Sequence, residues 1–366
     1  MNTWKNLKQT AYMAWVIGTK DILDVVKNKS TATNLLMMLG IVVFFYYLGV
    51  LRPFDKEVSV IFYDEGNSQR VPESMTLKNG AEYTFQKASS RSELEEILSH
   101  QDYNQDYGLV IPAGFDQSLD SGLQPTLTGV LLWPQRYKVA ELEAAYTRDL
   151  TELFGKPVKV SIKGNILIPR SDGNGMQVTL STNLLYFLLW SIITLVPTLM
   201  LEERKTKTLD ALVVSPASTV QIILGKAVAG MFYALVIGGL AVALDYLFIT
   251  NWLMLLLAFS LTALFCIGVA LALGSFIQSP IQLSLLALVI IISLLIPSFF
   301  AMEPILKAGI RAFIVWLPSV ALASLFRYAF SSSPASAQLW QNLLISLVYI
   351  GAIYGLVTWI VRRSDR

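Results

Sequence analysis

The sequence predicts a mainly α-helical membrane protein: six transmembrane helices, an N-terminal amphipathic helix, and a large extracytoplasmic α/β domain between the first two transmembrane helices. Hydrophobic residues make up 54% of the 366 residues and charged residues only 15%, against about 25% charged residues in soluble domains. The charges are also unevenly placed, because residues 52–180 hold 13 Lys/Arg and 18 Asp/Glu. A water-soluble insert inside an apolar chain accounts for both observations.

Residues 1–33 are expected to form a cytoplasmic amphipathic helix at the membrane interface. Trp4, Leu7, Ala11 and Trp15 fall on one helical stripe with lysines beside it, a pattern typical of helices that lie at headgroup depth. Charged residues recur throughout this segment, so we do not expect a cleaved signal peptide here. A simple membrane anchor and a mechanical role both stay open for this helix.

Six segments are expected to cross the membrane. A bilayer core of about 30 Å needs about 20 mostly apolar residues in a helix, and each segment comes close to that length. The six are residues 34–51, 184–201, 227–249, 252–276, 281–300 and 339–361.

The placement of basic residues predicts the orientation. The segments 1–33, 202–226, 277–280 and 362–366 carry 12 Lys/Arg, whereas the short segments on the other side carry three. Since basic residues concentrate in short cytoplasmic segments, we expect both termini in the cytoplasm and residues 52–180 outside. The membrane is expected to be a prokaryotic cytoplasmic membrane.

Residues 52–180 are expected to fold as an α/β domain. Short β-rich runs alternate with helical patterns, as in a small sheet covered by helices. Ser90 or Ser92 is the expected N-cap of the first helix, which has acidic residues in its early turns. The predicted strands are 58–63, 83–86, 108–112, 126–133 and 158–162, and the predicted helices are 90–100 and 138–154.

The most informative stretch is the predicted cytoplasmic segment 202–226, in which a charged run precedes a short helix pattern. Leu209 and Leu212 fall on one side of this helix, and Ser215-Pro216 ends it. A short amphipathic helix under the membrane needs a partner for its apolar face. That partner is either lipid or another protein.

This stretch resembles the signature of ABC-2 type permeases, E-x-E-x-G-T-L-E-x-L-L-x-S/T-P, followed by an apolar pair and Gly-Lys. Asp210 stands where the signature usually has Glu, and Lys207 where it usually has Gly. The layout is similar too: an amphipathic helix, one span, a large outer domain, five spans and a short basic tail. An ordinary basic inner loop is the alternative interpretation. The matching residues are Glu203, Thr208, Leu209, Leu212, Ser215, Pro216, Gly225 and Lys226.

The resemblance implies a type V exporter fold. In such proteins the loop helix docks into a groove on an ATPase subunit and transmits its closure to the spans. The implied partners are two ABC ATPase subunits, a second permease that is identical or paralogous, and membrane lipids, with no nucleic acid. Carried over residue by residue, the coupling segment comprises Glu203, Thr208, Leu209, Asp210, Leu212, Ser215 and Pro216, with Gly225 and Lys226 opening the third span.

Residues 301–338 are too interrupted for a simple span and too apolar for a free loop. Pro304 and Pro318 break the segment, and Glu303, Lys307 and Arg311 add charge. The resemblance implies an outer re-entrant helical hairpin that caps the transport path. An amphipathic surface helix is the alternative.

The resemblance also implies a function, that of the permease subunit in an ATP-driven exporter. The cargo would be a hydrophobic or amphipathic compound (lipid, drug or peptide-like) that leaves the cytoplasm or inner leaflet along spans two and five at a dimer interface. We expect no catalytic residue, because a phosphate-binding loop needs G-x-x-x-x-G-K-[ST] and Gly225-Lys226 is followed by Ala227. ATP and Mg²⁺ are expected on partner subunits and no cofactor in this chain. One cysteine, Cys266, and one histidine, His100, are too few for a zinc site.

Two other classes of protein are alternatives: an ion-coupled secondary carrier, and a membrane receptor with an extracytoplasmic sensing domain. A carrier usually shows repeated halves and broken helices, and neither is visible in the sequence. A receptor would not need the motif in 202–226. Asp245, near the outer end of the third predicted span, is either an interfacial or dimer-contact residue or part of the transport path. Glu303 is a second candidate for the path or interface.

Overall fold

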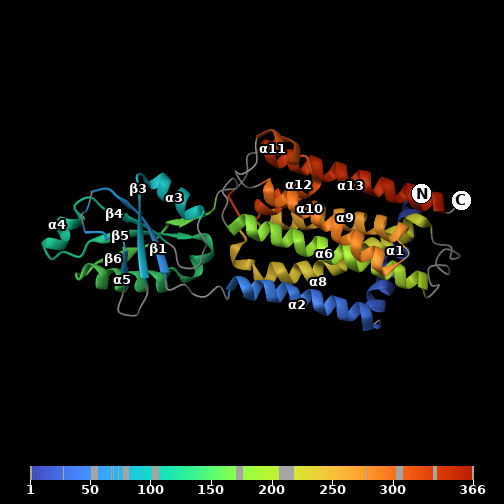
Figure 1. Cartoon of the computed structure of the whole chain (residues 1–366), viewed down its shortest axis with the longest axis horizontal. Helices are drawn as coiled ribbons and strands as arrows, with labels where there is room; N and C mark the ends of the chain where they lie inside the picture. Colours follow the sequence, from blue (N-terminus) through green and yellow to red (C-terminus); the bar gives the residue numbers. More distant parts are fainter. Residues whose placement is uncertain are drawn as a thin grey trace.

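The protein consists of a helical bundle with an α/β domain at one end (Figure 1). The first helix and the C-terminal end of the last helix lie at the opposite end of the bundle. The computed structural model describes residues 2–27, 29–50, 57–66, 68, 70–72, 74–76, 82–100, 107–169, 176–205, 218–277, 279–301, 308–332 and 336–364.

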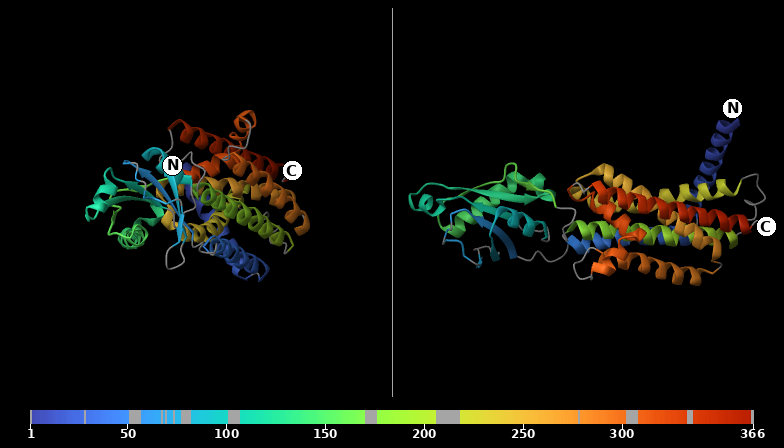
Figure 2. Two further views of the ribbon diagram at one scale, coloured as in Figure 1. Left: turned by 60° about the vertical axis from the view of Figure 1, so that its left-hand side comes forward. Right: turned by 90° about the horizontal axis from the view of Figure 1, so that it is seen from above.

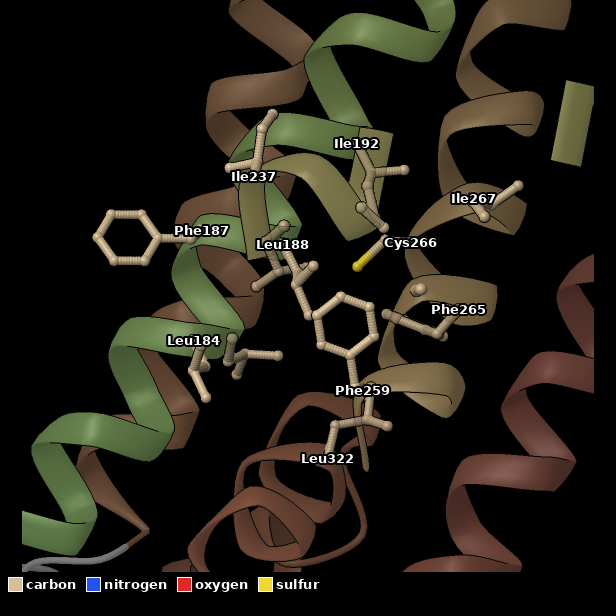
Figure 3. Close-up of a cluster of buried hydrophobic side chains, with 14 of the residues drawn as sticks. Leu184, Phe187, Leu188, Ile192, Ile237, Phe259, Phe265, Cys266, Ile267 and Leu322 are labelled. Carbon is tan, nitrogen blue, oxygen red and sulfur yellow. The ribbon is translucent and has the colours of Figure 1, made fainter. Parts of the chain in front are cut away.

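Two central helices organise the bundle. α6 and α9 bury most of their apolar surface, whereas α10 and α13 leave most of theirs exposed. Figure 3 shows part of the core between α6 and α9, where Leu188 of α6 lies close to Phe259 and Cys266 of α9. The long helices are α1 (Asn2–Lys27), α2 (Lys29–Val50), α6 (Met176–Lys205), α8 (Thr219–Leu244), α9 (Trp252–Phe276), α10 (Pro280–Phe300) and α13 (Ser336–Ser364).

Local sequence sets where these helices begin. The hydroxyl of Ser218 accepts the backbone N–H of Gln221 at 3.4 Å, and the Gln221 side chain accepts the Ser218 N–H in return, which is a capping box. Asn251 Oδ1 accepts the Met254 N–H at 3.1 Å at the start of α9. α10 starts at Pro280, a position where the missing N–H costs nothing.

Five helices in the described part of the chain are long and apolar enough to cross a membrane: Met176–Glu203, Gln221–Leu244, Trp252–Phe276, Pro280–Phe300 and Ala337–Ile360. They coincide with the second to sixth predicted spans. The first predicted span, 34–51, falls on α2, whose described apolar stretch is the shorter Ala32–Phe44. The count of six spans therefore stays a prediction.

Among its described residues, the α/β domain contains a seven-stranded sheet in the order β2-β3-β1-β4-β5-β6, with β7 paired to β5. β1 runs parallel to both of its neighbours, whereas β5 runs antiparallel to β4. The strands are β1 (Glu57–Asp64), β2 (Ser74–Thr76), β3 (Glu82–Ala88), β4 (Tyr107–Ile111), β5 (Thr126–Leu132), β6 (Lys159–Ser161) and β7 (Ile166–Leu167).

Helices cover both faces of the sheet. Side chains alternate along a strand. Ile61 of β1 therefore packs on one face of the sheet with Leu94 of α3 (Arg91–His100), and its neighbour Val60 belongs to the core on the other face, which contains Leu150. Ser90, not Ser92, is the N-cap of α3, since the Ser90 hydroxyl accepts the Glu93 N–H at 3.1 Å. The helices are α3 (Arg91–His100), α4 (Phe115–Asp120), the 3-10 helix η1 (Trp133–Lys138) and α5 (Val139–Phe154).

The α/β domain rests on the turn between α8 and α9, which includes the 3-10 helix η2 (Tyr246–Phe248). Trp133 Nε1 donates to the backbone oxygen of Ile249 at 3.1 Å, and Arg136 Nη1 donates to that of Leu247 at 2.6 Å. The Arg136 guanidinium also lies 4.1 Å from the centre of the Trp133 ring. η1 thus anchors the domain to the bundle.

The predicted segment 301–338 contains two short helices, α11 (Ala308–Ile314) and α12 (Pro318–Arg327). Ile310 and Phe313 of α11 are exposed, whereas nearly all of α12 is buried against α6, α9 and α13. An amphipathic surface helix therefore does not describe α12. The re-entrant arrangement stays a prediction, and Glu303 lies outside the described residues.

Candidate functional site

Four charged side chains from three helices form a cluster at the end of the bundle remote from the α/β domain, in which Lys20 is partly exposed and the other three are buried. Lys226, near the start of α8, donates to Asp21 Oδ2 of α1 at 3.0 Å and to Glu203 Oε2 at the end of α6. Lys20 donates to Glu203 Oε1 at 2.9 Å. The side chains of Lys226 and Asp21 are 3% and 2% exposed, so the contacts are shielded from water. We call Lys20, Asp21, Glu203 and Lys226 the ion cluster.

Two glycines let α1 and α8 approach closely enough for these contacts. A Cβ atom on Gly225 would lie 2.6 Å from the Ile17 side chain, and one on Gly18 would lie 2.7 Å from the Val228 side chain. The Tyr233 hydroxyl adds a hydrogen bond to the backbone oxygen of Asp21 at 3.0 Å. In the Gly225-Lys226 pair, the glycine therefore permits the close contact of α1 and α8, and the lysine supplies the positive charge that pairs with Asp21. Figure 2 shows α1 projecting sideways from the bundle.

The charges of the ion cluster balance, with two carboxylates against two ammonium groups. Dehydrating a single buried ion costs several kcal/mol, and only a well-placed opposite charge offsets that cost. Burial raises the pKa of Asp21 above its ordinary value, and the Lys226 ammonium opposes this shift. Removing Lys226 would leave two buried carboxylates with only the partly exposed Lys20 as a partner, so Lys226 holds α1, α6 and α8 in one arrangement.

The ion cluster joins the two ends of the predicted coupling segment. Glu203 lies just before residues 206–217, and Lys226 lies after them. Of the coupling residues that the sequence predicted, the structure brings Glu203, Gly225 and Lys226 together on α6 and α8. The other members, namely Thr208, Leu209, Asp210, Leu212, Ser215 and Pro216, lie outside the described residues.

The sequence did not single out Lys20 and Asp21 of α1. A signal was present, because Asp21 follows Ala14, Ile17 and Gly18 at helical spacing, and these three residues form the buried face of α1. A carboxylate on an apolar stripe calls for an ionic partner. What could not be read from the sequence is that the partner is Lys226.

A cavity of 180 Å³ lies between α2, α6 and α10. Its polar lining consists of Asn34, Thr194, Thr198 and Ser284, and none of the described residues that line it is charged. Thr198 precedes Glu203 by five residues on α6, which is about 7.5 Å along a helix. The cavity is therefore close to the ion cluster. Its lining helices include α6 and α10, the second and fifth predicted spans.

Pro197 lies inside α6 between Leu195 and Thr198, which both line the cavity. A proline has no N–H, so the carbonyl of Ile193, four residues earlier, lacks its usual helical partner. Such positions are where long helices bend. α6 therefore has a weak point beside the cavity.

Asp245 follows the last residue of α8 and adjoins η2, against which the α/β domain rests. Its role in a transport path or dimer contact stays a prediction. Within the described part of the chain, no three His, Cys, Asp or Glu side chains gather as metal ligands.

These features define a class of protein: a helical membrane protein with a cavity among its apolar helices and a charged junction at the end of the bundle. The chain belongs to the ABC-2 transporter family, because the family model described as "ABC-2 family transporter protein" matches residues 29–360. This match confirms the resemblance that the 202–226 motif and the layout indicated, and membership implies association with ABC ATPase subunits. No curated protein was found that matches the chain.

Proposed function

We propose that this chain is the permease subunit of an ATP-driven exporter and that the ion cluster is the joint through which an ATPase acts on the bundle. The observation that carries the proposal is the contact of Lys226 with Glu203 and Asp21. It ties both ends of the coupling segment to each other and to α1. A force applied to residues 206–217 would therefore move α6, α8 and α1 together.

The route from the joint to the cargo runs along α6. Glu203 is at its end, Pro197 provides a bending point, and Thr194 and Thr198 line the cavity. A tilt of the α6 end would change the shape of the cavity, because helices usually bend where a proline interrupts the hydrogen bonds. In this proposal the cavity holds a hydrophobic or amphipathic compound on its way out of the cytoplasm or inner leaflet.

The remaining parts of the complex belong to other chains. Two ABC ATPase subunits would hold ATP and Mg²⁺, so this chain would have no ATPase site and no cofactor of its own. A second permease, identical or paralogous, would complete the path. The termini and residues 206–217 would face the cytoplasm of a prokaryotic cell, with the α/β domain outside.

The test is export from vesicles that contain the permease with the ATPase chain that co-purifies with it. Glu203→Gln keeps the shape of the side chain and leaves Lys226 paired with Asp21. Since coupling between sites commonly amounts to 1–3 kcal/mol, we expect export per ATP hydrolysed to fall roughly ten-fold while the complex stays assembled. Lys163→Met, at an exposed position of the α/β domain, is the control and should change nothing.

Two outcomes would contradict the proposal. Transport driven by an ion gradient without ATP hydrolysis would identify a secondary carrier. Normal coupling in Glu203→Gln would show that the ion cluster is not the joint.

A further inference from the structure

We infer that the cavity between α2, α6 and α10 binds an organic cation whose charge is spread over a quaternary or delocalised group attached to a ring-sized apolar body. Its part in export rests on the proposed function. Binding itself does not, because it needs only this chain.

The polar side of the cavity presents oxygen acceptors. Thr194 donates its hydroxyl proton to the Trp190 carbonyl at 2.6 Å, Thr198 to the Thr194 carbonyl at 2.7 Å, and Ser284 to the Pro280 carbonyl at 3.0 Å. Each hydroxyl has one proton and two lone pairs, so its proton is already used within its own helix. These three oxygens therefore offer negative partial charge to a ligand. Asn34 adds an amide with one acceptor oxygen and an NH₂ donor group, so acceptor oxygens form the larger part of the polar lining.

The apolar side of the cavity is also suited to a positive charge. Trp190 contributes an indole ring, and Met37 and Met38 contribute thioether sulfurs. The face of a tryptophan ring attracts a cation, and a thioether is a polarizable, weak acceptor. Both groups prefer a soft, weakly hydrated cation to a compact ammonium ion, whose removal from water costs more.

The size and lining of the cavity further restrict which ligands it can bind. A cavity of about 150 Å³ holds one benzene ring, so 180 Å³ admits one ring with a small charged head. No carboxylate among its described lining residues balances the charge, so only a cation that is cheaply dehydrated, with a quaternary or delocalised charge, suits the cavity. A crevice of about 10 Å³, too small for such a ligand, shares Met38, Ile41 and Trp190 with the cavity.

The experiment uses the full-length permease in phosphatidylcholine nanodiscs and three probes of similar size. Phenyltrimethylammonium is the cation, tert-butylbenzene is its uncharged carbon isostere, and benzenesulfonate is the anion. Equilibrium dialysis, corrected with empty nanodiscs, gives each affinity. We expect phenyltrimethylammonium to bind about ten-fold more tightly than either other probe, as the sum of one cation–π contact and the oxygen acceptors.

Variants locate the site. Trp190→Leu removes the aromatic ring, and Thr194→Val removes the hydroxyl acceptor while keeping the shape of the side chain. Each variant should weaken phenyltrimethylammonium binding about three-fold or more. Thr358→Val is the matched control, because the Thr358 hydroxyl also donates to the carbonyl four residues earlier, at 2.8 Å, on α13. If either lining variant fails to fold, Ser284→Ala on α10 replaces it, and it should also weaken binding.

The inference is overturned if benzenesulfonate or tert-butylbenzene binds as tightly as phenyltrimethylammonium, or if binding is unchanged in all lining variants. Failure of the exporter proposal has a different signature. A permease that binds the cation at this site but does not depend on ATP hydrolysis for transport keeps the inference and refutes the proposed function. A permease that exports in an ATP-dependent way but does not bind the cation preferentially keeps the proposed function and refutes the inference.

Discussion

At the residue scale, the contact between α1 and α8 depends on glycine. Adding a methyl group at Gly225 would place a Cβ atom 2.6 Å from Ile17 and 3.2 Å from the backbone oxygen of Ala14. We expect Gly225→Ala to push the helices apart, to lengthen the Lys226–Asp21 contact, and to destabilise the protein by about 1–3 kcal/mol. Thermal unfolding in detergent measures the change.

Gly239 of the same helix provides the control, because nothing lies within 4 Å of a Cβ atom built there. Gly239→Ala should be neutral or stabilising by up to about 1 kcal/mol, since alanine is the better helix former. Equal unfolding temperatures for the two variants would mean that α1 does not pack on α8 as the structure shows.

Only some residues of the ion cluster could be predicted from the sequence. The motif indicated Glu203, Gly225 and Lys226, because their types and spacing are local features of 202–226. Asp21 is 205 residues from Lys226 along the chain. Nothing in periodicity or composition pairs residues at that separation, and only the packing of α1 across α8 brings them together.

At the element scale, η1 is the part of the α/β domain that bonds to the bundle, through Trp133 and Arg136. Trp133→Phe keeps an aromatic ring under the Arg136 guanidinium but removes the N–H that Ile249 accepts. We expect backbone amides of 246–249 to exchange hydrogen faster, roughly five-fold for one lost bond of about 1 kcal/mol. Hydrogen exchange with mass spectrometry measures this rate.

The same experiment needs a domain variant that leaves η1 alone. Arg91→Gln serves, because Arg91 is exposed on α3 and its guanidinium donates to Glu95 at 3.2 Å and to Asn165 at 3.0 Å, neither of which belongs to η1. Exchange at 246–249 should not change in this variant. Unaltered exchange in Trp133→Phe as well would indicate that the domain is held elsewhere.

Elements were predictable where the sequence pattern was long. β1, β3, α3, β4, β5 and α5 lie close to the predicted ranges, because apolar runs and helical spacing mark them. β2, β7 and α4 went unpredicted, since they have 3, 2 and 6 residues and do not lie in longer apolar runs, whereas the equally short β6 lies within the predicted strand 158–162. Trp133 was predicted to end a strand but begins η1, where Pro134 fixes a helical turn.

At the scale of the whole molecule, five of the predicted spans were recognisable because each is a continuous apolar run. α12 was harder to predict, since it is short, begins at a proline and is buried by neighbours that are distant in sequence. Its burial depends on tertiary packing against α6, α9 and α13.

The bundle has the α/β domain at one end and α1 at the other (Figure 1), so a bundle that crosses the membrane places the two on opposite sides. We expect an impermeant maleimide to label Leu123→Cys, at a position 65% exposed in the α/β domain, on intact cells. Lys8→Cys, exposed on α1, should be labelled only after lysis, because basic residues mark the cytoplasmic side. Cys266 is fully buried, so the unmodified protein should stay unlabelled and serves as the background. Equal labelling of both variants on intact cells would place both ends outside and would refute an odd number of crossings between α1 and the α/β domain.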